Sequence, residues 1–99
     1  MKYIADLVYN IKEELETAKE AAEKYVYYKS QSNAVRAKLY NEISNDELKH
    51  AKYYHDMVTE EITRLKDVYK PAAEMMKEWE EAHAEYVEKF AWIKQILQM

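Results

Sequence analysis

The sequence contains no glycine and a single proline, Pro71. Sheet proteins rely on glycine at tight turns and β-bulges, where the backbone adopts positive φ angles. The absence of glycine across 99 residues therefore favours helices joined by short polar connections. Good helix formers, namely alanine, glutamate, lysine, leucine and methionine, make up much of the remainder. We expect one all-α domain.

Composition also excludes several classes of function. The chain has no cysteine, so disulfides and thiolate metal sites cannot contribute. The net charge of -4 provides no basic surface for nucleic acid. The first ten residues include Asp6 and do not resemble a secretory signal, and no apolar run approaches the roughly 18 residues of a membrane span. We expect a cytoplasmic protein that binds neither nucleic acid nor membranes.

Apolar residues at helical spacing predict three long helices, over residues 3–28, 33–69 and 71–97. Ser32 or Asn33 is a plausible N-cap for the second helix, and Pro71 suits the first turn of the third. Because short connections make sequential helices antiparallel, we expect an antiparallel three-helix bundle. The predicted core stripes are Ile4, Leu7, Val8, Ile11, Leu15, Ala18, Ala21, Ala22, Tyr25 and Val26; Leu39, Ile43, Tyr54, Met57, Val58, Ile62, Leu65 and Val68; and Met75, Trp79, Ala82, Tyr86, Phe90, Ile93 and Leu97.

The second helix has an alternative interpretation. Ser44 and Glu47 have the spacing of a capping box, which could end one helix and begin another near Asn45. The apolar stripe passes through this point in phase, however. We therefore predict one continuous helix.

Three ionisable side chains fall within the apolar faces, where an unpaired charge is costly. Glu14 is the one acid on the apolar face of the first helix, and Glu47 and His50 lie within the stripe of the second. An antiparallel turn near Gln31 places Glu47 level with residue 15, so Glu14 and Glu47 agree in height to within about 1.5 Å, the rise of one residue. Angle and height together predict that Glu14, Glu47 and His50 meet.

Carboxylates and an imidazole suit iron, manganese or zinc, and the lack of thiolate favours the first two. A Glu and a His separated by three residues project from one face of a helix, as helix bundles require for metal binding. We therefore predict that Glu14, Glu47 and His50 bind iron, or alternatively manganese. The competing interpretation is a buried hydrogen-bonded cluster that only fixes the helix register.

The segment YNEISNDELKHA, residues 40–51, resembles the second helix of the ferritin-like superfamily, particularly its rubrerythrin branch. That helix carries Glu-x-x-His followed by alanine, here Glu47, His50 and Ala51, and Glu14 matches the glutamate of the preceding helix. The resemblance covers residues 14–57, half of the usual four-helix unit. It implies a homodimer or larger homo-oligomer, as in encapsulated ferritins, in which two chains form a four-helix core and share a di-iron site. The implied activity is ferroxidase-like oxidation of Fe(II), with Glu47 bridging the metals and Glu14 and His50 as terminal ligands.

A second Glu-x-x-His, Glu80 and His83, lies on the third helix. With the second turn near Lys70, this pair lies about ten residues, or roughly 15 Å, along the axis from Glu47 and His50. The two pairs therefore cannot form one site within a single chain unless the second helix breaks. Glu61 lies at the height of Glu80 and His83 and could form a separate polar cluster with them.

Other residues support less specific interpretations. Tyr54 could donate a hydrogen bond to a metal ligand, although core packing is the more ordinary role for it. His55 points away from the predicted stripe, so we expect it to be solvated. Ten tyrosines in so short a chain also leave open a partner-binding patch. The alternative function is therefore a structural or adaptor bundle without catalytic activity.

Overall fold

The computed structural model describes residues 2–66 and 73–99, which form three α-helices and, within those ranges, no strand. The helices are α1 (Lys2–Ser30), α2 (Ala34–Lys66) and α3 (Ala73–Leu97). The all-α prediction is confirmed. The predicted end of the second helix at residues 67–69 and the predicted role of Pro71 lie outside the described residues. No helix in the described ranges has an apolar stretch long enough to cross a membrane.

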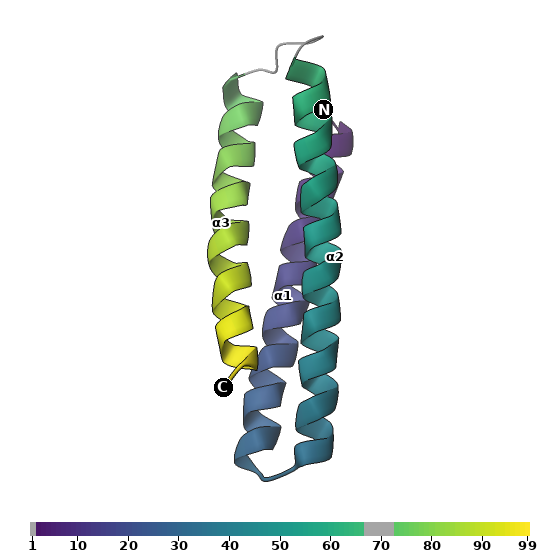
Figure 1. Cartoon of the computed structure of the whole chain (residues 1–99). Coiled ribbons are helices and arrows are strands. Elements are labelled where there is room, and N and C mark those ends of the chain that lie inside the picture. The colour runs from purple at the N-terminus through teal and green to yellow at the C-terminus, as the bar shows by residue number, and fades with distance from the viewer. Residues whose placement is uncertain (1, 67–72) are drawn as a thin grey trace.

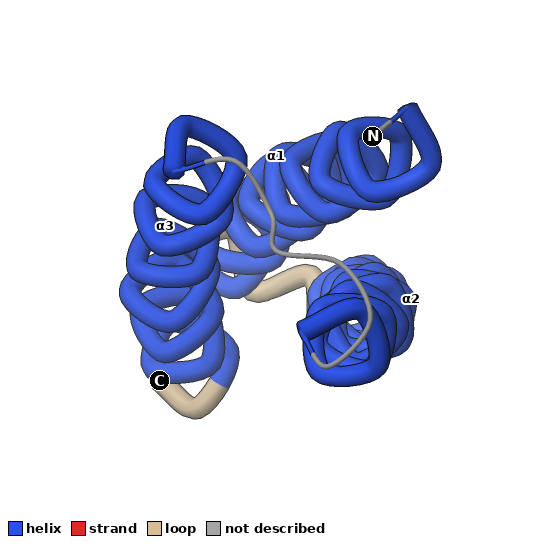
Figure 2. Tube along the Cα trace, turned by 90° about the horizontal axis from the view of Figure 1, so that it is seen from above, coloured by secondary structure: helices blue, strands red, loops and turns tan. Residues whose placement is uncertain are grey.

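The three helices form an elongated molecule of 55 × 18 × 16 Å. α1 and α2 form an antiparallel hairpin, and α3 again runs antiparallel to α2 (Figure 1). Viewed from above, α3 and α2 lie on different sides of α1 (Figure 2). α1 packs extensively against α2 and less against α3, whereas α2 and α3 touch at few points. The α1–α2 hairpin is therefore the main packing unit.

The turn between α1 and α2 occupies residues 31–33 and needs no glycine. Ser32 adopts a φ of 57°, the left-handed conformation in which helices commonly end. The Asn33 amide donates to the Tyr28 carbonyl at 2.9 Å, and the Ser32 amide to the Lys29 carbonyl at 3.1 Å, which is the Schellman pattern of C-terminal capping. The side-chain oxygen of Asn33 then accepts from the Arg36 amide at 3.1 Å, so Asn33 is the N-cap of α2.

α2 continues unbroken through residues 44–47, so the alternative start at Asn45 is wrong. The Ser44 side chain is fully buried, and its hydroxyl donates to the Ala18 carbonyl of α1 at 2.7 Å. A serine engaged across the interface in this way does not cap a helix. Ser44, which the local sequence pattern indicated as a possible helix N-cap, therefore serves in the packing of α2 against α1.

The core lies mainly between α1 and α2, and small side chains occupy much of it. Its fully or nearly fully buried members include Ile11, Leu15, Ala18, Ala22, Ser44, Leu48, Ala51, Val58 and Ile93. Alanine and serine at the contact allow the two helix backbones to approach closely. Leu48 and Val58 then fill the space beside them, because interiors leave few voids.

The predicted core stripe of α2 is partly wrong. Val58 and Ile62 are buried as expected, but Leu39, Ile43 and Met57 are 53%, 45% and 40% exposed. The buried face of α2 instead carries Ala37, Ser44, Leu48 and Ala51. α2 thus has a second apolar face, which no other part of the described chain covers.

Replacing Ser44 with alanine should lower the free energy of unfolding by about 1 kcal/mol, the net value of one hydrogen bond. Urea denaturation monitored by circular dichroism measures this change. Thr63→Ala is the matched control, because Thr63 is exposed and donates only within its own helix, to the Thr59 carbonyl. An equal loss in both variants would show that the bond between Ser44 and Ala18 contributes nothing specific.

Candidate metal centre

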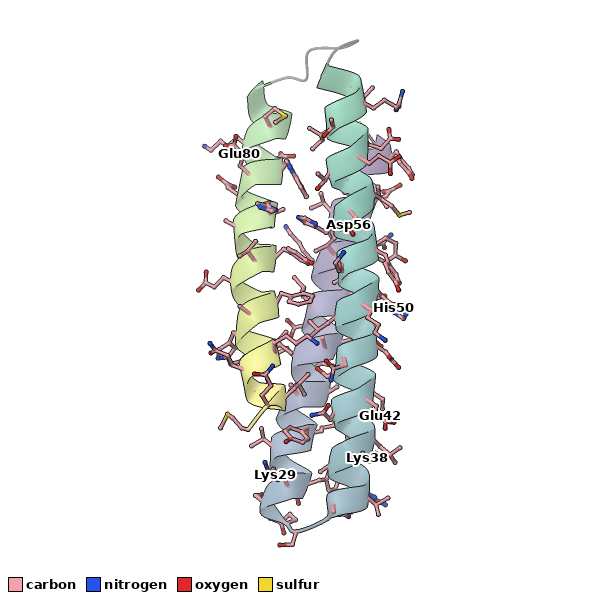
Figure 3. All side chains as sticks on the ribbon, viewed as in Figure 1. Lys29, Lys38, Glu42, His50, Asp56 and Glu80 are labelled. Atoms are coloured by element: carbon pink, nitrogen blue, oxygen red, sulfur yellow. The ribbon has the colours of Figure 1, made fainter. Side chains whose placement is uncertain are left out.

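Glu14, Glu47 and His50 come together on the α1–α2 hairpin, as the sequence predicts. One ligand atom from each of the three side chains lies within 4.8 Å of the others, and no other group of three or more such residues occurs in the described part of the chain. Figure 3 shows His50 projecting from α2 on the side away from α3. The group therefore lies on the face of the hairpin that α3 leaves open.

The helical geometry explains this meeting. Glu47 and His50 are three residues apart on α2, so both side chains leave the same face. The Thr17 hydroxyl, one turn beyond Glu14 on α1, donates to Glu47 Oε2 at 3.3 Å. Together with the bond between Ser44 and Ala18, this contact fixes the α1–α2 register at the height predicted from the turn.

The separations within the group are those of a loose cluster rather than a set of direct hydrogen bonds. His50 Nδ1 lies 3.6 Å from Glu14 Oε2 and 3.9 Å from Glu47 Oε2. Glu14 Oε2 is buried, and no hydrogen-bond donor reaches it. Buried polar atoms almost always have a partner, and those without one require an explanation. A cation between the three side chains would provide that partner.

The electrostatics of Glu14 agree with this geometry. Burial, together with the neighbouring Glu47 carboxylate, raises the pKa of Glu14 to about 7, although His50 opposes the change. The negative charge on Glu14 is therefore poorly compensated by the protein alone. A divalent cation would stabilise both carboxylates in the charged form, since a nearby positive charge favours ionisation.

Access to the group is open from one side. The side chains of Glu14 and Glu47 are 22% and 28% exposed, whereas that of His50 is 54% exposed. The two carboxylates are therefore largely shielded, whereas solvent reaches the imidazole. A cation held here would have three ligands from one chain and further coordination positions facing outward.

Thr17 was not among the predicted site residues. The sequence could have indicated Thr17, because it lies three residues after Glu14 on α1 and residues three apart share a helix face. Its other acceptors are the Glu13 and Glu14 carbonyls, so the hydroxyl also bonds to its own helix. Tyr54, considered as a donor to the ligands, packs against the hydrophobic core.

Glu61, Glu80 and His83, considered above as a possible second cluster, do not form a ligand group in the described part of the chain. Glu61 pairs with Arg64 at 2.9 Å, and His83 contacts His55. The expectation that His55 is solvated is wrong, because its side chain is only 15% exposed. It lies between α2 and α3 against the ring of Tyr86. The prediction failed because it considered only the α2 stripe, whereas α3 covers a different side of that helix.

Tyrosines gather at the turn end of the hairpin. Tyr28 and Tyr40 stack with ring centroids 5.5 Å apart, and Lys24 lies 5.4 Å from the centroid of Tyr40. A shallow hollow of about 440 Å³ lies beside them, lined by Tyr27 and acidic residues of α1. Tyr28 contacts both Tyr27 and Tyr40, while Tyr27 itself remains 56% exposed.

Comparisons of this chain with protein-family models, with curated proteins and with solved structures found no match. The resemblance to the ferritin-like superfamily therefore remains a prediction that depends on Glu14, Glu47 and His50 and their geometry.

Proposed function

We propose that this chain is a ferritin-like metal-binding protein whose site is completed when two copies associate. The observation that carries the proposal is the convergence of Glu14, Glu47 and His50 around a buried carboxylate oxygen that has no donor. Oxygen and imidazole ligands in a helix bundle suit iron or manganese. Glu47 would bridge two metal ions, while Glu14 and His50 would each bind one of them.

The uncovered apolar face of α2 supports association with a second copy. Leu39 and Ile43 precede the site on this face, and Tyr53 and Met57 follow it, all of them exposed. The midpoint of α2 is His50, which is itself one of the three site residues. A two-fold axis through this point would pack the α2 helices of two copies along their full length, with Ile43 of each chain against Met57 of its partner.

Such a dimer would also complete the donor set. Each chain offers two carboxylates and one imidazole, so two chains offer four carboxylates and two imidazoles. This is the number that di-iron carboxylate bundles use. When bound, iron would supply the electrons for reduction of dioxygen. The protein residues would hold the ions, and the packed α2 faces would limit the access of water.

An anaerobic titration with Fe(II) tests the proposal on the metal-free chain at known oligomeric state. We expect about one iron per chain in a dimer, as two half-sites require, followed by ferric absorption in the near-ultraviolet when air enters. Glu47→Ala should abolish tight binding, because the bridging carboxylate is lost. Glu42→Ala, an exposed glutamate on the same helix, should bind iron as the wild type does.

Two outcomes would contradict the proposal. Full iron binding by the Glu47→Ala variant would remove Glu47 from the site. No tight binding by the wild type would leave a structural helical protein, in which Glu14, Glu47 and His50 only fix the register of α1 and α2.

A further inference from the structure

Several polar contacts join α2 and α3. Near the C-terminus of α3, Asn41 donates to the Leu97 carbonyl at 2.9 Å and Lys94 to the Asn45 side chain at 2.7 Å. Farther along α2, the two helices are joined by His55 and His83. Neither histidine belongs to the candidate metal centre, which lies on the opposite side of α2.

The two imidazoles meet through their ring nitrogens. His55 Nε2 lies 2.7 Å from His83 Nδ1, with ring centroids 4.9 Å apart and ring planes at 25°. The Tyr86 ring stacks on the His55 ring, with centroids 4.3 Å apart and ring planes at 11°. The centroid of the Trp79 ring lies 5.4 Å from that of His55. His55 is thus held in place by aromatic rings, whereas His83 is exposed.

The Asp56 carboxylate lies beside Nδ1, the other ring nitrogen of His55. Its Nδ1 is 3.4 Å from Asp56 Oδ1, and Lys52 pairs with Asp56 at 2.7 Å. A carboxylate in this position favours the proton on Nδ1, which leaves the lone pair of Nε2 directed at His83. Histidines that bind metals usually have such a partner on their second nitrogen.

We propose that His55 Nε2 and His83 Nδ1 form a two-imidazole site for a borderline divalent cation such as Zn(II), completed by water. Without metal, the Nδ1–H of His83 donates to His55, so one proton occupies the space between the nitrogens. When the proton of neutral His83 moves to its solvent-facing Nε2, both facing nitrogens present lone pairs. No net proton is then gained or lost.

Metal binding requires the two imidazoles to change their relative position. Two Zn–N bonds of about 2.05 Å at a tetrahedral angle separate their nitrogens by about 3.3 Å. The present 2.7 Å must therefore widen by about 0.6 Å. Because the two nitrogens face each other along one line, an ion on the His55 lone pair also requires His83 Nδ1 to move sideways by about 2 Å. The exposed side chain of His83 makes this movement, while His55 stays stacked on Tyr86. Imidazole donors favour Zn(II), Cu(II) and Ni(II) over magnesium, calcium or manganese, which prefer oxygen.

The protonation of His55 supports the same site. Burial is the main cause that lowers the pKa of His55 below its ordinary value; the contact with Asp56 opposes this change, and the nearby His83 adds to it. The ring therefore remains neutral over more of the physiological pH range, as a metal ligand must. A bound ion would tie α3 to α2, where the two helices otherwise touch at few points.

Zn(II) titration calorimetry on the full chain tests this site. The double variant Glu47→Gln/His50→Gln serves as background, because it disables the other candidate centre. We expect the background protein to bind one Zn(II) per chain and to melt at a higher temperature in its presence. Adding His83→Gln should weaken binding at least about tenfold, the scale on which ligand-shell mutations act. Adding Glu80→Gln, one turn earlier on α3, should leave binding unchanged.

A spectroscopic measurement keeps the test independent of variant stability. Cu(II) bound to the background protein should show hyperfine coupling to two nitrogens in its electron paramagnetic resonance spectrum. The proposal is overturned if the background protein binds no Zn(II), if binding survives His83→Gln, or if Cu(II) couples to fewer than two nitrogens. Loss of binding in the Glu80→Gln variant would assign the site to Glu80 and His83 and would also overturn it.

Discussion

Replacing Glu14 with glutamine should stabilise the metal-free protein at pH 8 and leave its stability nearly unchanged at pH 5. Burial and Glu47 raise the pKa of Glu14 from an ordinary 4.5 to about 7 in the folded chain. The folded state therefore binds this proton more tightly than the unfolded state does, so stability falls as the pH rises from about 4.5 through 7. At about 1.4 kcal/mol per pKa unit, the loss reaches at most about 3 kcal/mol.

Glutamine reproduces the shape of the protonated acid and cannot ionise, so the variant avoids this loss. Urea denaturation at both pH values, in the presence of a chelator, measures the difference. Glu20→Gln on the exposed side of α1 is the control and should show no comparable gain. A variant that is less stable than the wild type at pH 8 would mean that the Glu14 carboxylate is stabilised by contacts within the folded chain.

The same substitution should weaken iron binding, because the neutral amide is a poorer ligand than a carboxylate. Gain of stability combined with loss of metal binding is typical of a functional site, where residues are retained at a cost to the fold. A residue that serves only to fix helix register should instead lose stability on substitution, with no effect on metal binding. The pair of measurements therefore separates the metal site from its structural alternative.

Replacing Met57 with glutamate should convert the proposed dimer into a monomer. In the proposed packing, Met57 of each chain lies against Ile43 of its partner, so one substitution buries two charges in an apolar contact. An unpaired buried charge costs several kcal/mol, and each 1.4 kcal/mol is tenfold in affinity. We expect the dissociation constant to rise at least about a hundredfold.

Sedimentation equilibrium measures the mass, and circular dichroism checks that the helices remain. Val87→Glu is the matched control, because Val87 is similarly exposed but lies on α3, away from the proposed interface. Iron binding should weaken together with dimerisation in the Met57→Glu variant and remain unchanged in the control. A Met57→Glu protein that keeps the mass of two chains would place the dimer contact on another surface.

The sequence by itself determined the helical class, the α1–α2 register and the meeting of Glu14, Glu47 and His50. Without glycine the chain favours helices, and a short turn at residues 31–33 makes the first two antiparallel. The rise per residue then sets the height of every side chain along the hairpin. Such properties depend on local geometry and on counting along the chain, so they needed no knowledge of neighbouring packing.

Only the tertiary structure decided which side of α2 is buried. Leu39, Ile43 and Met57 are more hydrophobic than Ala37, Ser44 and Ala51, yet the smaller residues face α1. Two helices can approach closely only where the side chains between them are small. A ranking of residues by hydrophobicity does not predict this preference. The pairing of His55 with His83 likewise depends on the side from which α3 approaches α2. That direction is set by packing among three helices, and no periodicity within one helix encodes it.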